Sequence, residues 1–308
     1  MLIRQAAFDG PEKTLKGALH CHTIRSDGKG DPDAVMRMHA EHGYDFMAIT
    51  DHRRYNWETY APETGITIIP GMEYDNTFEK GNGFRCFHTV CIGHADKTNG
   101  FEHEQRFESG TAKNQEEYQP YLDWLHKNGQ MTIYCHPEWS STPARYFEKQ
   151  QGNFAMEIWN SGCAIEDHMD MNAAYWDELL GQGIHIFGVA TDDGHAMYQH
   201  CNGWVNVRSE NNVDAILAAL NEGAFYSSCG PVIKDFYVED GVAHVECSEA
   251  SFIEFISDRH PTKMLRGENL TSGEIDLNGG WAGGYDYIRV SVVDAEGRRA
   301  WTNPIWLK

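Results

Sequence analysis

Long apolar runs and positive charge are both scarce in this 308-residue sequence. No segment approaches the ~18 apolar residues that a helix needs to cross a bilayer, so no membrane-spanning helix is expected. Residues 1–10 lack a charged start followed by an apolar core, and this argues against a signal peptide. Internal repeats and low-complexity tracts are absent as well. These absences favour a cytoplasmic globular protein that does not bind membranes.

The shortage of positive charge bears on partners. Only 25 residues are Lys or Arg, against 46 Asp or Glu, so the formal net charge is −21. A surface of this sign repels nucleic acids and anionic membranes in general. We therefore expect no nucleic acid polymer as partner, and an anionic small-molecule substrate would need cations placed locally. The sequence indicates no oligomeric state.

The eight cysteines include no Cys-x-x-Cys pair. In a chain of this size without a signal peptide, they favour reduced core or site-lining thiols over a disulfide framework. The sixteen histidines are more informative, because many of them follow apolar, strand-like runs.

Strands and helices alternate up to about residue 228. The apolar runs are short and lack clean polar alternation, which is typical of strands buried on both faces of a parallel sheet. Alternation of this kind predicts an α/β fold, and seven runs favour a closed barrel with its chemistry at the carboxyl ends of the strands. The runs are the one ending at Leu19, then 46–50, 66–69, 87–93, 131–135, 153–159 and 184–190.

Two regions depart from this rhythm. Residues 95–113 are polar and without a clear period, which favours a lid facing the substrate. From residue 230 the segments become β-type and are separated by turns, so the pattern predicts a small antiparallel β module, similar to a sandwich. The predicted domains are therefore 1–229 and 230–308.

Metal-type ligands stand at or near the ends of five or six of the predicted strands. A single His after one strand is more often a satisfied core residue than a ligand. Many imidazoles and carboxylates packed at one barrel mouth would repel one another and lose hydration, and divalent ions remove that penalty. The candidate ligands are His20, His22, Asp27, His52, Glu73, His88, His136, Asp193 and His195.

Several of these residues lie in motifs that resemble the PHP (polymerase and histidinol phosphatase) superfamily. The similar motifs are Leu-His-Cys-His-Thr, Ser-Asp-Gly, Ile-Thr-Asp-His, Pro-Gly-Met-Glu, Cys-His-Pro and Asp-Asp-Gly-His, in the family's order from about residue 15 to 228. The resemblance implies a distorted seven-stranded β/α barrel and a metal-dependent phosphoesterase with two or three ions.

Carried over by position, the resemblance implies three sub-sites. One holds His20, His22, Glu73 and Asp193, a second holds Glu73, His88 and His136, and a third holds Asp27, His52 and His195. Glu73 would bridge two ions, because a carboxylate has two oxygens.

Some of these assignments leave alternatives open. His94 is a rival to His88, because residues 78–85 resemble an insertion. Asp51 and Asp192 are predicted to orient ligating imidazoles, although Asp192 could exchange roles with Asp193.

The chemistry expected of such a site is attack by a metal-bound hydroxide. The leading hypothesis is hydrolysis of a small-molecule phosphomonoester or phosphodiester. A carboxylic ester or carbamate hydrolase on the same site is the alternative, and a non-catalytic scaffold stabilised by metal is a third reading. Mixed imidazole and carboxylate ligands suit Zn, Mn or Fe. A thiol nucleophile, Cys21 or Cys135, is a minor alternative.

Three arginines in loops next to the motifs are candidates for binding a phosphoryl group: Arg25, Arg53 and Arg54. A guanidinium can bind two phosphate oxygens at once, which lysine cannot. The alternative is that these arginines only pair with the surplus surface carboxylates.

Overall fold

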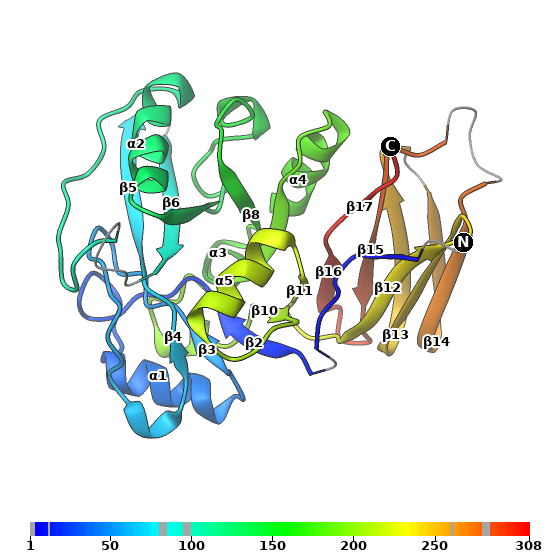
Figure 1. Ribbon diagram of the computed structural model, residues 1–308, viewed down its shortest axis with the longest axis horizontal. Coiled ribbons are helices and arrows are strands. Elements are labelled where there is room, and N and C mark those ends of the chain that lie inside the picture. Colours follow the sequence, from blue (N-terminus) through cyan, green and yellow to red (C-terminus); the bar gives the residue numbers. More distant parts are fainter. Residues whose placement is uncertain (1–3, 12, 80–84, 95–99, 260–261, 279–283) are drawn as a thin grey trace.

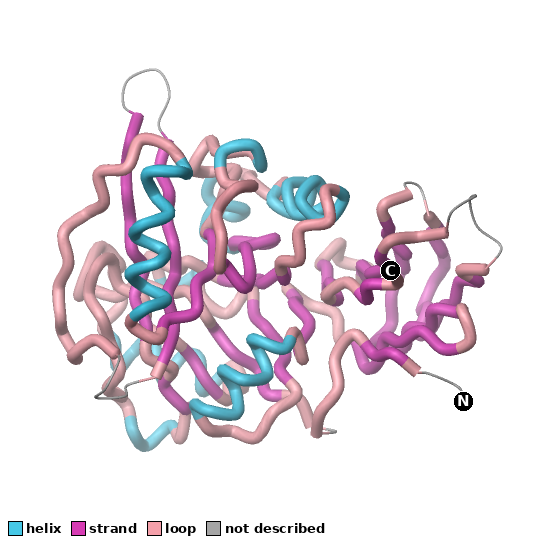
Figure 2. The backbone as a smooth tube through the Cα atoms, turned by 45° about the horizontal axis from the view of Figure 1, so that its top comes forward, coloured by secondary structure: helices cyan, strands magenta, loops and turns pink. Residues whose placement is uncertain are grey.

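A computed structural model describes residues 4–11, 13–79, 85–94, 100–259, 262–278 and 284–308. The chain has a mixed α/β region and a sheet-rich C-terminal region, the latter at the right of Figure 1. Two sheets build the α/β region, and helices lie around their outside (Figure 2). None of the helices in these ranges is long and apolar enough to cross a membrane.

One sheet of the α/β region has the order β5-β6-β7-β8-β9. The other has the order β11-β10-β2-β3-β4 and continues through β11 into the C-terminal region. Their strands are β2 (Leu15–Ala18), β3 (Phe46–Met47), β4 (Thr67–Ile68), β5 (Gly71–Glu79), β6 (Arg85–Gly93), β7 (Gln130–Tyr134), β8 (Asn153–Asn160), β9 (Phe187–Thr191), β10 (Trp204–Val207) and β11 (Phe225–Ser228).

Short contacts join the two sheets on both sides. Isolated bridges pair Cys21 with Gly194 on one side and His52 with Glu73 on the other. Near the first of these, the Ser227 hydroxyl of β11 donates to Gly188 O of β9 and accepts from Ala190 N. A buried apolar cluster then fills the interior with side chains from both sheets, among them Leu19, Phe46, Val90, Ile133, Ala155, Val189 and Val205. The strand ends of both sheets are thereby brought to one mouth.

The strand directions differ from the expected parallel barrel. Parallel pairs are confined to β2–β3–β4 and β7–β8–β9, whereas β5, β6, β10 and β11 pair antiparallel. For β5 and β6 the reason is that they follow each other in the chain and pair as a hairpin, because a short connection can join antiparallel strands whereas parallel strands need a crossover. Of the predicted insertion at 78–85, residues 78–79 end β5 and Arg85 begins β6, and residues 80–84 lie outside the described ranges. The exact count of seven barrel strands is not confirmed.

The helices follow standard end signals. They are α1 (Pro32–Glu41), α2 (Gln115–Lys127), α3 (Ser161–Asp167), α4 (Asn172–Gly181) and α5 (Val213–Glu222), with 3-10 turns η1 (Pro62–Thr64), η2 (Ala144–Tyr146) and η3 (Met197–Gln199). The side chains of Asn114 and Asn212 cap α2 and α5 by accepting backbone N–H groups. Residues 161–181 form two helices and not one, because His168 adopts a left-handed backbone and ends α3.

The C-terminal region is antiparallel throughout, as the sequence predicted. It contains β12 (Ile233–Glu239), β13 (Val242–Ser257), β14 (Lys263–Asp276), β15 (Tyr287–Val293), β16 (Arg299–Thr302) and β17 (Ile305–Trp306). The register of β13 shifts on either side of Ala250, and its neighbour changes there from β12 to β15. The N-terminal strand β1 (Gln5–Ala6) pairs with β12, and Phe8 joins the buried cluster of this region. Residues 5–8 therefore lie with the C-terminal sheet and not in the barrel domain, 1–229, where the sequence placed them.

The predicted lid is packed onto the protein over its described residues, 100–113. Phe101 and Phe107 contact each other and Trp124 of α2. The backbone also bonds to the loop after β3, through Tyr55 N to Gln105 O and Phe107 N to Arg53 O. Its aromatic side chains thus give this part of the segment an apolar anchor, and its role as a lid facing the substrate stays a prediction. Residues 95–99 of the prediction lie outside the described ranges.

A buried ion pair connects α4 to the C-terminal sheet. The Arg289 side chain of β15 is 2% exposed and makes three hydrogen bonds of 2.6–2.9 Å to the Asp177 carboxylate. Its guanidinium also lies 4.7 Å from the centre of the Trp176 ring. Removing one partner of such a pair leaves a charge buried without its counter-ion.

We therefore expect Asp177→Ala to lower the free energy of unfolding by about 2–3 kcal/mol, less than for a fully buried pair because Asp177 is 36% exposed. Urea unfolding followed by circular dichroism measures this. Asp214→Ala is the matched control, because Asp214 is 87% exposed where it pairs with His94, and it should change stability by less than ~1 kcal/mol. Equal effects of the two variants would contradict a structural role for the buried pair.

Candidate metal centre

All nine predicted ligands lie together at the mouth formed by the strand ends. Their side chains line or adjoin a pocket of about 260 Å³. His20 and His22 follow β2, His52 follows β3, Glu73 and His88 lie on the β5–β6 hairpin, His136 follows β7, and Asp193 and His195 follow β9. The cluster is therefore assembled from both sheets.

Glu73 is at the centre of the cluster and is 1% exposed. Its Oε2 lies 3.1–3.4 Å from ring nitrogens of His20, His22 and His52. Its Oε1 lies 2.9 Å from His88 Nδ1 and 3.3 Å from His136 Nε2. The two oxygens thus face two different sets of imidazoles, which is the arrangement that a bridging carboxylate requires.

Asp193 and Asp27 complete the groups. Asp193 Oδ1 is 3.3 Å from His20 Nε2 and 3.0 Å from His22 Nε2. Asp27 lies 3.4 Å from His195 Nε2 and 3.6 Å from His52 Nε2. Three groups of side chains each have their candidate ligand atoms within 4.8 Å of one another. The groups are His20, His22, Glu73 and Asp193; His52, Glu73 and His88; and His22, Asp27, His52 and His195. They overlap the three sub-sites that the resemblance implied, with His22 and His52 each near two of them.

Unusual backbone conformations turn two of these residues into the mouth. His136 has φ 27° and Asp193 has φ 50°, in the region that L-residues seldom adopt. Each follows the last residues of a buried strand, so the chain must turn sharply there. Such conformations cost of order 1–3 kcal/mol each and tend to cluster at functional sites.

Glu157 is a residue of the candidate site that the sequence reasoning missed. It is fully buried on β8 and accepts from His20 Nδ1 at 2.7 Å, His136 N at 2.8 Å and the Thr191 hydroxyl at 2.6 Å. The bond to His20 fixes that ring and leaves its Nε2 directed at Glu73 and Asp193. The sequence did contain a signal for it, because Glu157 is the charged residue inside the apolar run 153–159.

The supporting acids act differently from the prediction. Asp51 accepts from Thr23 N, the Thr23 hydroxyl and the Ser26 hydroxyl, so it holds the loop after His22 and contacts no ligating imidazole. The acid beside His52 is instead Asp75, whose Oδ2 lies 3.2 Å from His52 Nδ1.

The positions of Asp192 and His94 decide the two alternatives that the sequence left open for the ligands. Asp192 points away from the mouth and accepts from the backbone N–H groups of residues 201–203, so it does not replace Asp193. His94 lies beyond the opposite end of β6 and pairs with Asp214 of α5, whereas His88 lies against Glu73.

The chemistry of the cluster fits metal ions. Glu73 Oε2, Asp193 Oδ1 and His52 Nδ1 are buried and have no hydrogen-bond partner. Because His20 Nδ1 is committed to Glu157, its Nε2 carries a lone pair when the ring is neutral, and this lone pair faces carboxylate oxygens. Lone pairs directed at one another in a buried site repel, and a cation between them converts the repulsion into attraction.

Without metal, protonated imidazoles supply the positive charge instead. Burial alone lowers the pKa of His20, but the carboxylates of Asp193 and Glu73 outweigh it and raise this pKa well above its ordinary value. Burial likewise opposes the shift at His195, where the hydrogen bond that the ring donates to the Asp27 carboxylate raises the pKa to about 9. For Glu73, burial would raise the pKa, but the surrounding imidazoles of His52 and His20 hold it well below the ordinary range.

The predicted phosphate-binding arginines are already partnered. Arg25 and Arg54 both pair with Glu104 of the segment 100–113. Arg53 Nε lies 3.2 Å from Asp75, and its side chain is 37% exposed. The three arginines stay predictions as substrate ligands. Arg53 is the one that does not pair with an acid of the 100–113 segment, and its side chain is not deeply buried.

The thiols next to the ligands face the interior. Cys21 Sγ donates to Ala48 O at 3.3 Å, and Cys135 Sγ accepts from Val90 N at 3.2 Å. Both side chains are fully buried, and burial raises the pKa of each thiol. Neither thiol is therefore suited to be a nucleophile.

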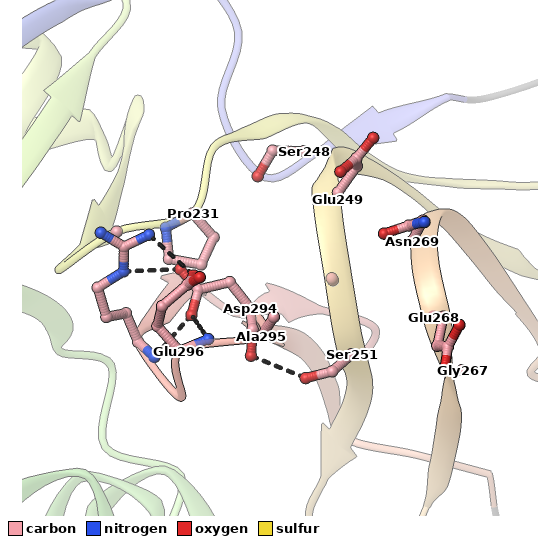
Figure 3. A pocket seen from close by; sticks show the side chains of 13 residues that line it. Pro231, Ser248, Glu249, Ser251, Gly267, Glu268, Asn269, Asp294, Ala295 and Glu296 are labelled. Carbon is pink, nitrogen blue, oxygen red and sulfur yellow. Dashed lines mark hydrogen bonds and ion pairs between the residues drawn. The ribbon is translucent and has the colours of Figure 1, made fainter.

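A larger cavity of about 550 Å³ lies in the C-terminal region and shares no lining residue with the metal-side pocket (Figure 3). Its polar groups bond to one another, with Asp294 accepting from Glu296 N and pairing with Arg298, and Ser251 donating to Asp294 O. None of the partnerless buried side-chain atoms in the described ranges lies there. Of these two cavities, only the one at the barrel mouth has partnerless buried atoms on its lining, on His52, Glu73 and Asp193.

The family comparison agrees with this placement. Residues 18–226 match the model of the PHP domain. The chain belongs to the PHP domain family. The match begins just before His20 and ends after β10, so it covers the whole metal-side cluster of this PHP domain. No curated protein matches the chain.

Solved structures similar to this PHP domain protein are distant. A two-domain protein of Bacteroides vulgatus that contains a predicted PHP-like metal-dependent phosphoesterase is 14% identical, with 98% of each chain covered and a TM-score of 0.49. An amidohydrolase from Chromobacterium violaceum is 14% identical over 58% of this chain and 87% of its own, with a TM-score of 0.40. A proposed metal-dependent phosphoesterase of Bifidobacterium adolescentis is 13% identical over 69% and 97%, with a TM-score of 0.41.

Metal loading of the stripped protein should release protons. A group with a raised pKa holds its proton below that pKa, so His20, His88 and His195 are protonated near pH 7 when no ion is bound. Metal needs the same lone pairs and displaces those protons. We expect more than one proton released per chain near pH 7, and fewer well above pH 9. An indicator dye in weak buffer measures the release; no release near pH 7 would contradict the site.

Glu73→Ala should remove more than one bound ion, because both oxygens of this carboxylate face candidate ligand groups. Elemental analysis of the purified variant measures the loss. Glu166→Ala is the control, since Glu166 lines the same pocket without being one of the nine ligands, and it should keep the full metal content. Retention of all metal by Glu73→Ala would show that Glu73 does not bridge.

Proposed function

We propose that this PHP domain hydrolyses phosphomonoesters or phosphodiesters of small molecules with two or three bound divalent ions, of Zn, Mn or Fe. The observation that carries the proposal is the position of Glu73, whose two buried oxygens face separate sets of imidazoles. A site that only stabilised a scaffold would not need ligand groups that share a carboxylate and open into a pocket. The non-catalytic reading is therefore the weaker one.

The residues of the chain hold and orient the reacting groups. Bound divalent ions supply a nucleophile near neutral pH and stabilise the charge that builds on the attacked centre. Glu157 fixes the ring of His20, and Ser26 lies 3.3 Å from His22 Nδ1, so both imidazoles present Nε2 to the centre. The group of Asp27, His52 and His195 is nearest to solvent, with Asp27 55% exposed. We place the substrate on that side.

The size of the pocket supports a small substrate or the terminal group of a larger one. Its volume of about 260 Å³ is just below the ~300–1,000 Å³ usual for small-molecule sites. The ring of Trp139 closes one side, 5.0 Å from His136 and 5.9 Å from His88. The carboxylates of Glu166 and Asp167 line another part. They repel further negative charge, so the phosphoryl group would enter from the side of Arg53.

The second candidate is hydrolysis of a carboxylic ester or carbamate. The pairing of Arg25 and Arg54 with Glu104 favours it, because these guanidiniums are then largely neutralised and attract an anion less. An uncharged ester needs no such cations. The nine ligands serve either reaction, so the local positive charge distinguishes the two.

We further propose that the protein acts in the cytoplasm, because its eight cysteines are free thiols, as expected in a reducing compartment. Its substrate would be small, and a nucleic acid polymer remains an unexpected partner for a chain with a net charge of −21. We also keep the seven-stranded barrel and the domain division near residue 230 as proposals.

Arg53→Ala tests the phosphoryl assignment. Loss of a charged contact to the transition state should lower kcat/KM for p-nitrophenyl phosphate or bis(p-nitrophenyl) phosphate by about 10²–10³. Hydrolysis of p-nitrophenyl acetate by the same variant should change far less. Arg37→Ala is the control, because Arg37 is 51% exposed on α1 and pairs with Glu63. Equal, small effects of Arg53→Ala on both substrates would favour the carboxylic ester or carbamate alternative.

A further inference from the structure

A second cluster of buried polar side chains lies outside the nine ligands. It joins α1 to the segment that follows β9 and contains His39, Asp192 and His200, which are 0%, 1% and 2% exposed. Their candidate ligand atoms all lie within 4.8 Å of one another. No step of the proposed hydrolysis uses these residues.

Three of the four ring nitrogens of His39 and His200 have no hydrogen-bond partner. His39 Nδ1 donates to Val35 O at 2.8 Å, so Nε2 of the neutral ring carries a lone pair, and this Nε2 has no hydrogen-bond partner. Burial lowers the pKa of His39 to about 4, which keeps the ring neutral. Both nitrogens of His200 are also without a partner. The two rings stand edge to face with their centres 5.4 Å apart.

The carboxylate of Asp192 makes no ion pair with a lysine or arginine in the described part of the chain. Its oxygens accept from the N–H groups of Cys201, Asn202 and Gly203 at 2.6–2.8 Å. Oδ2 accepts only one of these bonds and therefore keeps a lone pair. The nearest ion-pair partner in the described part of the chain is the neutral His39, whose Nε2 is 4.0 Å from Oδ2.

In the described residues, the side chains around Asp192 form no ion pair that would neutralise its carboxylate. The Lys16 ammonium lies over the rings of Tyr44 and Trp204, at 4.2 and 4.0 Å, and makes no ion pair with Asp192 in the described residues. Tyr44 packs its ring against His39, and its buried hydroxyl is a further atom without a partner. Gly194 is needed here, because a Cβ at this position would lie 2.4 Å from His200 Nδ1.

We propose that His39, Asp192 and His200 bind one Zn²⁺ ion as a structural site separate from the catalytic cluster. Two neutral imidazoles and a carboxylate are ordinary zinc ligands, with a fourth position left for water or the Tyr44 hydroxyl. A buried water would satisfy some of the same atoms, but it would not balance the carboxylate charge. The ion would fasten α1 to residues 192–200, a segment that carries the catalytic ligands Asp193 and His195.

The first test is the metal content of His39→Gln and His200→Gln, purified with zinc and compared with the wild type by elemental analysis. Each variant should lose one equivalent of zinc and keep the remaining equivalents, and ester turnover should persist within a few-fold. His126→Gln is the matched control, because His126 is a partly buried helical histidine whose Nε2 bonds to Thr132. It should keep every equivalent. Full zinc content in both His39→Gln and His200→Gln would overturn the proposal.

A second measurement on the wild type does not depend on the variants folding. Crystals of the zinc-loaded protein, measured at the zinc absorption edge, should show an anomalous peak between His39 Nε2, His200 and Asp192 Oδ2. Peaks in the catalytic cluster serve as the internal control that the crystals are loaded. Catalytic peaks with no peak at this position, or with ordinary water density there, would overturn the proposal even if the variants had lost metal.

Discussion

The burial of negative charge at the barrel mouth is the constraint on which the rest of this structure depends. Glu73 and Asp193 are almost fully enclosed, and an isolated carboxylate in such a place would lose several kcal/mol of hydration. Imidazoles from the ends of four strands and from the middle of β6 surround them, and Glu157 fixes the ring that touches both. The strained backbones of His136 and Asp193 follow from the same requirement, because their side chains must turn inward at the end of a strand.

The two sheets are arranged to meet this requirement. Parallel strands β2–β3 and β7–β9 deliver ligands at their carboxyl ends, whereas the hairpin β5–β6 inserts Glu73 and His88 from its middle. Bridges from Cys21 to Gly194 and from His52 to Glu73 close both sides at the level of the site. The geometry of the centre therefore depends on how the sheets meet more than on either sheet alone.

Charge is also balanced outside the centre, with consequences for substrate choice. Glu104 reaches Arg25 and Arg54 from the segment 100–113, which Phe101 and Phe107 anchor in the core. A strongly acidic chain thereby neutralises two of the three cations nearest to its mouth. Behind the mouth, Asp192 remains buried without an equivalent partner among the described residues. Both observations come from pairings between segments that are far apart in the sequence.

The sequence by itself determined the family, the nine candidate ligands and the antiparallel character of the C-terminal region, because motif order, residue type and turn spacing are local properties. It did not determine the direction of β5, the place of β1 beside β12 or the split between α3 and α4, since these depend on connections and partners that local patterns do not specify. Only the tertiary structure showed that Glu157 supports His20, that Asp192 turns away from the mouth and that Glu104 pairs with the arginines. The physical reason is that burial and pairing of a charge are decided by which distant segments meet.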